Sequence, residues 1–125
     1  MQIKVLVVDD NKNNLLLEKD LLELAGFEVL EAENGTSGIA IAIRERPDVI
    51  IMDVRLPDIR GTDAAKMIRQ NEATNNIPVV FVTASVTNEG MQELSSINNS
   101  RSIGKPINTR TFVDDIRQFY FDSRK

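Results

Sequence analysis

Four short apolar runs constrain the fold of this chain more than any other feature. They lie at residues 3–8, 27–30, 49–52 and 79–82. None of them alternates between apolar and polar residues, and continuous runs rich in β-branched side chains are typical of strands buried on both faces of a parallel sheet. The alternation of such strands with helices predicts βαβ units, whose right-handed crossovers place helices on both faces of the sheet.

The segments between the runs have helical spacing. We expect four helices to bury one apolar stripe each: Leu17, Leu21 and Leu24; Ile39, Ala42 and Ile43; Ala64, Met67 and Ile68; and Phe112, Ile116 and Phe119. Gly26 stands where the first helix would end, and Asn34 or Thr36 would cap the second. The third helix covers about residues 62–70, and the last begins near Asn108 or Thr109.

The pattern weakens at residues 87–104, where serines and asparagines dilute it. Only Ile103 indicates a fifth strand there, and we expect a short edge strand at residues 101–104. The elements then form five βα units, which is an α/β fold with a doubly wound parallel sheet. No linker, internal repeat or low-complexity tract divides the chain, so we expect one domain over residues 1–125.

Composition narrows the chemistry that is available. The chain has no Cys and no His, which excludes a disulfide framework, zinc sites built on sulfur, Ser-His-Asp catalysis and most transition-metal sites. Carboxylates, hydroxyls, amines or a hard cation bound by oxygen remain. The net charge of -4 argues against a nucleic-acid partner. There is no signal peptide and no apolar stretch of the roughly 20 residues that a membrane span needs, so we expect a soluble cytoplasmic protein.

Polar residues follow the apolar runs directly. Asp9 and Asp10 come after the first run, Asp53 after the third, Thr83 after the fourth and Lys105 after the expected fifth strand. In an open parallel sheet, ligands bind beyond the carboxyl ends of the strands, where the strand order reverses. Three carboxylates gathered there repel one another unless a cation compensates, and an all-oxygen set suits Mg²⁺. Together with a lysine and a hydroxyl, the set indicates phosphoryl transfer to a carboxylate.

Each of these residues also has a purely structural interpretation. Asp9, Asp10 or Asn11 could be the N-cap of the first helix, a position that Asp and Asn strongly favour. Asp53 could begin a turn, and Lys105 could be a solvated surface charge. Their joint placement at successive strand ends favours the functional interpretation.

The motifs around these residues resemble the receiver domain of bacterial two-component response regulators, the CheY-like superfamily. The similarity spans essentially the whole chain and rests on VLVVDDN at residues 5–11, PDVIIMD at 47–53, IPVVFVTA at 77–84 and Lys105-Pro106. The Asp-Asp-Asn-x-x-Asn opening at residues 9–14 is similar to stand-alone DivK-type regulators and to receivers attached to hybrid kinases. The resemblance implies a flavodoxin-like sheet with the strand order 2-1-3-4-5.

The resemblance also implies how the residues act. Asp53 would be the phosphoacceptor, which attacks a phosphohistidine on a sensor histidine kinase or a histidine phosphotransfer protein. Mg²⁺ would be held by the side chains of Asp10 and Asp53, by Asp9 through water and by the backbone carbonyl of Arg55. The output would be contact with an unknown downstream protein, so the chain would be a signalling domain and not an enzyme for a small substrate.

Two further residues would contact the phosphoryl group. Thr83 would hydrogen-bond to it and draw the following loop inward, while Lys105 would pair with phosphate and carboxylate. The Lys105-Pro106 peptide bond would be cis, which is a minority state of X-Pro bonds.

Three positions bear on switching and on the lifetime of the phosphoryl group. Ser102 stands where the family usually has Tyr or Phe, so a large aromatic rotation is not available to it. Arg55 and Ser85 flank the path of an attacking water. We hypothesise that the Arg55 guanidinium reaches across the phosphoryl group and slows its hydrolysis, because a guanidinium suits bidentate phosphate contacts.

Other interpretations remain at this point. A phosphatase of the haloacid dehalogenase type would need a second Asp two residues after the nucleophile, where Arg55 stands. A flavodoxin-like cofactor binder would need a phosphate loop after the first strand, where Asp9 and Asp10 would repel phosphate. A receiver that signals without phosphorylation would not need the full polar set. The chain could also be a module of a hybrid kinase or larger regulator, and either a monomer or a weak phosphorylation-dependent dimer.

Overall fold

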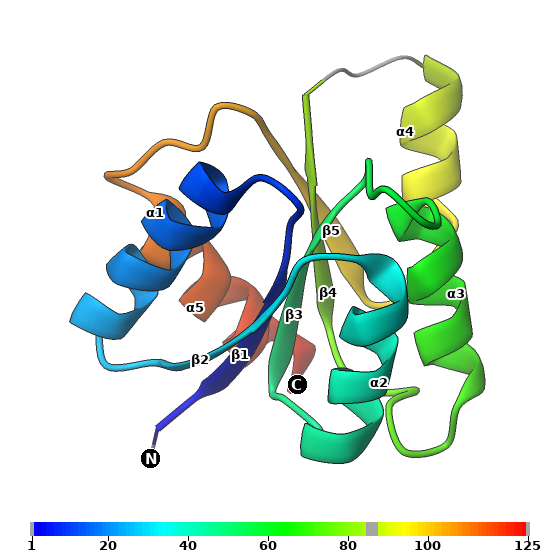
Figure 1. The fold of residues 1–125 in the computed structure, drawn as a ribbon, viewed down its shortest axis with the longest axis horizontal. Helices are drawn as coiled ribbons and strands as arrows, with labels where there is room; N and C mark the ends of the chain where they lie inside the picture. The colour runs from blue at the N-terminus through cyan, green and yellow to red at the C-terminus, as the bar shows by residue number, and fades with distance from the viewer. Residues whose placement is uncertain (1, 85–87, 125) are drawn as a thin grey trace.

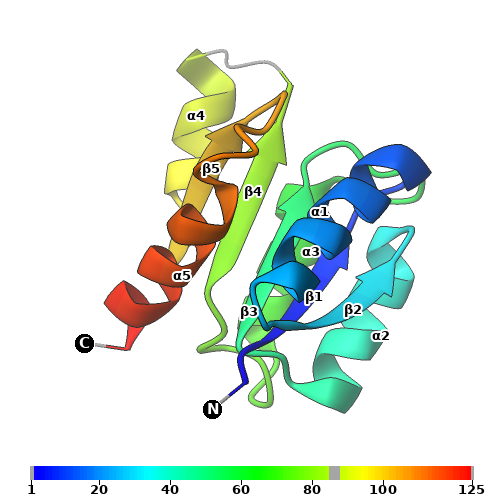
Figure 2. The same ribbon diagram turned by 90° about the vertical axis from the view of Figure 1, so that its left-hand side faces the viewer.

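Five parallel strands form a single sheet that carries helices on both faces (Figures 1 and 2). The computed structural model describes residues 2–84 and 88–124. The strands are β1 (Lys4–Val8), β2 (Glu28–Ala32), β3 (Val49–Asp53), β4 (Val79–Thr83) and β5 (Ser100–Gly104). Their order is β2-β1-β3-β4-β5, which confirms the flavodoxin-like topology expected from the sequence. The weak fifth strand is also confirmed.

The helices divide between the two faces of the sheet. They are α1 (Lys12–Leu24), α2 (Gly35–Glu45), α3 (Gly61–Gln70), α4 (Asn88–Ser95) and α5 (Phe112–Ser123). Helices α1 and α5 lie on one face, and α2, α3 and α4 cover the other (Figure 1). One apolar cluster forms on each side, so the sheet is covered twice, as a doubly wound fold requires. In the described part of the chain, no helix is long and apolar enough to span a membrane.

The strands in the middle of the sheet are the most deeply buried. Every residue of β3 and β4 is buried, whereas the edge strands β2 and β5 have exposed positions. The burial explains why these runs are continuous in the sequence and do not alternate. Because Asp53 is the last residue of β3, its carboxylate lies at the rim of this rigid central part.

Side-chain caps fix where two of the helices begin. The Oδ1 atom of Asn11 accepts hydrogen bonds of 3.0 Å from the backbone N–H groups two and three residues later. Asn34, and not Thr36, caps α2 in the same way, with a bond of 2.8 Å to the N–H three residues later. Gly26 follows α1 with a φ of 94°, a conformation that glycine adopts without steric cost.

The buried face of α1 differs from the prediction. Leu17 and Leu24 are 41% and 87% exposed, and the buried residues are Leu15, Glu18 and Leu22. Leucines occupy more than one face of this helix, so their spacing alone allows more than one apolar stripe. The way the chain leaves β1 and enters the helix sets its rotation, and this information is absent from helical periodicity.

The prediction that two further residues lie in the core is wrong for a related reason. Ile43 of α2 and Met67 of α3 are 37% and 51% exposed. Small residues bring these helices close to the sheet. A Cβ added to Gly38 would lie 2.9 Å from a methyl group of Val8, and Ala64 is fully buried. Ile43 and Met67 lie outside these close contacts.

The last helix begins later than expected. Residues 108–111 form a turn in which the carbonyl of Asn108 accepts hydrogen bonds of 3.1 and 2.9 Å from the N–H groups of Thr111 and Phe112. Helix α5 therefore starts at Phe112 and not near residue 108 or 109. The predicted stripe is nevertheless confirmed, because Phe112, Ile116 and Phe119 are all buried.

The loop that follows β3 is held at both ends and in the middle. The N–H of Gly61 donates to the carbonyl of Val54 at 2.8 Å. In the middle of the loop, the Asp58 carboxylate accepts hydrogen bonds of 2.8 Å from the first two backbone N–H groups of α2. Gly61 also lies so close to the backbone carbonyl of Asp53 that a Cβ there would overlap with it. The loop therefore has little freedom to change its path.

We expect the substitution Gly61→Ala to destabilise the protein by about 1–3 kcal/mol, because its Cβ would collide with backbone and not with a flexible side chain. Urea unfolding followed by circular dichroism measures this loss. The matched control is Gly104→Ala, where a Cβ would meet nothing within 4 Å. Equal midpoints for the two variants would contradict the close approach at Gly61.

Candidate functional site

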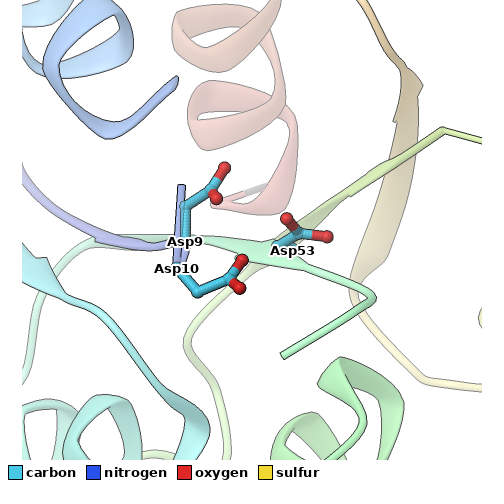
Figure 3. Close-up of side chains that lie close together, drawn as sticks. All are labelled: Asp9, Asp10 and Asp53. Carbon is cyan, nitrogen blue, oxygen red and sulfur yellow. The ribbon is translucent and has the colours of Figure 1, made fainter. Parts of the chain in front are cut away.

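Three carboxylates meet at the carboxyl ends of β1 and β3 (Figure 3). One oxygen from each of Asp9, Asp10 and Asp53 lies within 4.8 Å of the others. The strand register explains the meeting, because Val8 is paired with Met52 and the following residues on both strands are aspartates. The expected convergence of these three residues is confirmed.

Backbone amides hold two of the carboxylates in place. The Oδ1 atom of Asp9 accepts a hydrogen bond of 2.8 Å from the N–H of Asn11, and Oδ1 of Asp53 accepts one of 2.9 Å from the N–H of Arg55. Both carboxylates are buried, with exposures of 2% and 5%, whereas Asp10 is exposed. Since Asn11 is the cap of α1, neither Asp9 nor Asp10 serves as the helix cap.

Lys105 brings an ammonium group into this cluster. Its Nζ donates a hydrogen bond of 2.7 Å to Oδ2 of Asp53 and lies 3.9 Å from Oδ2 of Asp9. Because β5 pairs with β4, the backbone N–H of Lys105 donates to the carbonyl of Thr83 at 2.8 Å, which fixes where the side chain starts. The Lys105-Pro106 peptide bond is cis, as the resemblance implies.

The charges of the cluster shift the pKa values of its members. Burial raises the pKa of Asp9, and the negative charge of Asp53 raises it further, although the Asn11 amide and Lys105 act against this. Burial lowers the pKa of Lys105, but its hydrogen bond and charge interaction with Asp53 outweigh burial, so the pKa rises. One ammonium thus faces three carboxylates. An oxygen-only cluster with surplus negative charge can accept a hard divalent cation.

The remaining predicted residues lie around this cluster. Thr83 is buried at the end of β4, beside the strand that carries Asp53. Arg55 is exposed and its backbone pairs with Arg60 in an isolated antiparallel bridge. Ser102 is exposed on the edge strand β5. Ser85 lies outside the described residues.

Glu18 is a residue of this region that the sequence analysis missed. It is 2% exposed, and its Oε1 atom has no hydrogen-bond partner in the described part of the chain. Burial raises its pKa to about 8, the negative charge of Asp9 adds to the rise, and Lys105 opposes it. Leu15, Glu18 and Leu22 are spaced as i, i+3 and i+7, and this spacing is the sequence signal that places Glu18 on a buried stripe of α1.

Comparison with protein families decides what kind of domain this is. The model of the response regulator receiver domain family matches residues 5–117. The chain belongs to this family. Receiver domains are signalling modules of two-component systems, not conventional enzymes. In the family, they interact with histidine kinases or phosphotransfer proteins.

Individual relatives agree with the assignment. The polar-differentiation response regulator DivK of Brucella anthropi is 31% identical over 123 residues, which cover 98% of this chain and all of DivK. Chemotaxis response regulator CheY4 of Vibrio cholerae has a structure with a TM-score of 0.89 and 29% identity, over 95% of this receiver domain and 99% of CheY4.

A third protein is similar in fold. It is the receiver domain of the sensor histidine kinase PA1611 of Pseudomonas aeruginosa, whose crystal structure has a magnesium ion coordinated in the active site cleft. Its TM-score is 0.87 at 24% identity, and the match covers 97% of this receiver domain and 99% of that one.

We expect Glu18→Gln to change how stability depends on pH. The folded-state pKa of about 8 lies above the ordinary value of 4.5, so the folded wild type binds more protons than the unfolded chain between these values and loses stability as pH rises through them. The glutamine variant has no such loss. Its advantage over wild type should grow between pH 5 and 8.5 by on the order of 3–5 kcal/mol, and then level off.

Urea unfolding at several pH values measures this difference. Glu23→Gln, an exposed glutamate on the same helix, is the control and should follow the wild type. Parallel stability curves for wild type and Glu18→Gln would show that Glu18 ionises in the folded protein as readily as in the unfolded one.

Proposed function

We propose that this receiver domain accepts a phosphoryl group on Asp53 from a phosphohistidine of a sensor histidine kinase or a histidine phosphotransfer protein. The reaction depends on Mg²⁺, and the phosphorylated domain signals by binding another protein. One observation supports this proposal more strongly than any other feature of the site. The ammonium of Lys105 lies 2.7 Å from Oδ2 of a buried Asp53, beside two further carboxylates.

The geometry of Asp53 supports its role as the nucleophile. Its Oδ1 accepts a hydrogen bond from the Arg55 N–H and its Oδ2 accepts one from Lys105, so a phosphoryl group attached at Oδ2 would lie beside the Lys105 ammonium. In the transfer, the new O–P bond forms while the N–P bond to the partner's imidazole breaks, and that nitrogen keeps the electron pair. Residues 1–125 contain no histidine, so the donor imidazole lies outside them.

The donor set fits Mg²⁺, because it consists of oxygens with surplus negative charge and contains no nitrogen or sulfur ligand. The side chains of Asp10 and Asp53, Asp9 through water and the backbone carbonyl of Arg55 would hold the ion. Bound Mg²⁺ would neutralise negative charge that develops on the phosphoryl oxygens. The magnesium ion described for the PA1611 receiver domain supports this part of the proposal.

Two other residues would receive the phosphoryl group. The Lys105 ammonium already donates a hydrogen bond to Asp53, and a small movement would let it donate to a phosphoryl oxygen on the same residue. Thr83 ends the neighbouring strand, one residue beyond Val82, the register partner of Asp53, so it lies at the same carboxyl edge of the sheet as the acceptor. A response through residue 102 must differ from an aromatic rotation, because Ser102 is small and exposed on β5. We propose that the response reaches the surface formed by α4, β5 and α5, and that this surface contacts a partner protein or forms a weak dimer.

The rival phosphatase reaction is less well supported. It needs a general acid two residues after the nucleophile, and Arg55 occupies that position with its side chain exposed. A guanidinium does not donate a proton at ordinary pH. We therefore propose no turnover of a small substrate.

We expect Asp53→Asn to abolish phosphorylation. Wild-type protein incubated with Mg²⁺ and a small acyl phosphate should gain one phosphoryl group by intact mass, and the variant should gain none, because an amide is not a nucleophile for phosphorus. Asp20→Asn, which changes an exposed aspartate of α1, is the control and should be modified like wild type. Phosphorylation of the Asp53→Asn variant, or no phosphorylation of the wild type, would overturn the proposed function.

We expect Arg55→Ala to lose the phosphoryl group faster than wild type. A guanidinium that contacts the phosphoryl group would block the approach of water, so its removal should raise the hydrolysis rate by roughly three- to tenfold. The decay of phosphorylated protein after removal of the donor, followed by intact mass, measures the rate. Arg44→Ala on α2 serves as the control for loss of an exposed arginine. An unchanged or slower decay in Arg55→Ala would refute the shielding role.

A further inference from the structure

Glu18 occupies a position that the fold alone would give to an aliphatic side chain. It lies on the buried stripe of α1 between Leu15 and Leu22, and both leucines belong to the apolar cluster beneath α1 and α5. Its Oε1 atom is fully enclosed and makes no hydrogen bond within the described residues. Burying a carboxyl without a partner is unfavourable even when it is neutral, and far more so when it is charged. Packing therefore gives no reason for a glutamate at this position.

The surroundings of Glu18 point to the acidic cluster. The charged groups that interact with it are Asp9 after β1, Asp53 at the end of β3 and Lys105 after β5. From α5, the apolar cluster that contains Leu15 and Leu22 includes Phe112, Ile116, Phe119 and Tyr120, and of these four only Tyr120 has an ionisable group. The other charged side chains of α1 are exposed or half-buried. A change in the charge of the cluster is thus the electrostatic event that Glu18 can respond to.

We propose that Glu18 is a positioning residue of the phosphoryl-acceptor site, which holds a proton while the site is empty and releases it to solvent when a divalent cation binds between Asp9, Asp10 and Asp53. The inference rests on the function proposed above. It adds a fourth carboxyl, that of Glu18, to those of Asp9, Asp10 and Asp53, and it makes the site sensitive to pH.

The coupling follows from the sign of the charges. With the cluster unoccupied, burial and the negative charge of Asp9 keep Glu18 neutral near pH 7, since its pKa is about 8. A cation among the carboxylates reverses the local potential and favours the charged form of Glu18. Ionised Glu18 in turn stabilises the positive charge of the cation and of Lys105. By reciprocity, the factor by which Mg²⁺ raises the acidity of Glu18 equals the factor by which ionised Glu18 raises the affinity for Mg²⁺.

The functional consequence is a receiver domain whose readiness for phosphorylation follows pH. Below pH 7, Glu18 stays protonated and the site binds Mg²⁺ weakly. Above pH 8, Glu18 is ionised and the site binds Mg²⁺ more tightly. The change falls in a pH range in which aspartates of ordinary pKa do not titrate.

Nuclear magnetic resonance tests the coupling in two ways. The carboxyl ¹³C shift of Glu18 gives its titration midpoint, which should fall by about one pH unit when saturating Mg²⁺ is added. Titration of ¹⁵N-labelled protein with Mg²⁺ at pH 6.5, 7.5 and 8.5 gives the affinity, which should rise on the order of tenfold over this range in wild type. The Glu18→Gln variant should bind Mg²⁺ with nearly the same affinity at all three values.

Two controls separate this role from a structural one. Glu18→Gln keeps the shape of the side chain, and its circular dichroism spectrum shows whether it folds. Glu23→Gln, on the exposed face of the same helix, should retain the pH dependence of wild type.

The outcomes are distinct. A Glu18 midpoint that Mg²⁺ does not move, or equal pH dependence in wild type and Glu18→Gln, would overturn the inference and leave the proposed function intact. Failure of both proteins to bind Mg²⁺ at any pH would overturn the proposed function and this inference with it.

Discussion

Mutual repulsion among three neighbouring carboxylates, offset by Lys105, is the constraint on which the site depends. Asp9 and Asp53 are taken out of water at the ends of adjacent central strands, and each keeps one oxygen on a backbone amide. The buried sheet makes this arrangement possible, because β1 and β3 cannot move apart to relieve the repulsion. Positive charge offsets this repulsion. It comes from the ammonium of Lys105 and, we propose, from a bound cation.

Much of the fold could be predicted because the signals that determine it are local. Continuous apolar runs gave the strands, and the βα alternation and the resemblance gave the topology. The carboxyl-terminal positions of Asp9, Asp10 and Asp53 then followed from the rule that parallel strands end at one edge. The same rule placed Lys105 at this edge, and the resemblance predicted that it pairs with a carboxylate, although 52 residues separate it from Asp53.

The errors concern the rotation of the helices about their axes. In α1 the leucines fit more than one apolar stripe. The predicted stripe with Leu17 and Leu24 is exposed, and Glu18 belongs to the stripe that is buried. In α2 and α3, glycine and alanine at the contact let the backbones approach, so Ile43 and Met67 were left outside. Such choices depend on how loops deliver the chain into each helix and on close packing with other elements, which periodicity does not contain. The helical spacing of Glu18 with Leu15 and Leu22 is the sequence signal that marks this stripe.

The loop between β3 and α3 has a consequence for anyone who engineers this domain. Its two ends meet at Val54 and Gly61, and Asp58 fastens its middle to the start of α2. A peptide tag or an extra module inserted there would disturb the Val54–Gly61 hydrogen bond or the Asp58 contacts with α2, and Gly61 lies directly against the backbone of Asp53. Loops at the opposite edge of the sheet, away from the strand ends that carry the aspartates, are therefore the safer sites for grafting a reporter.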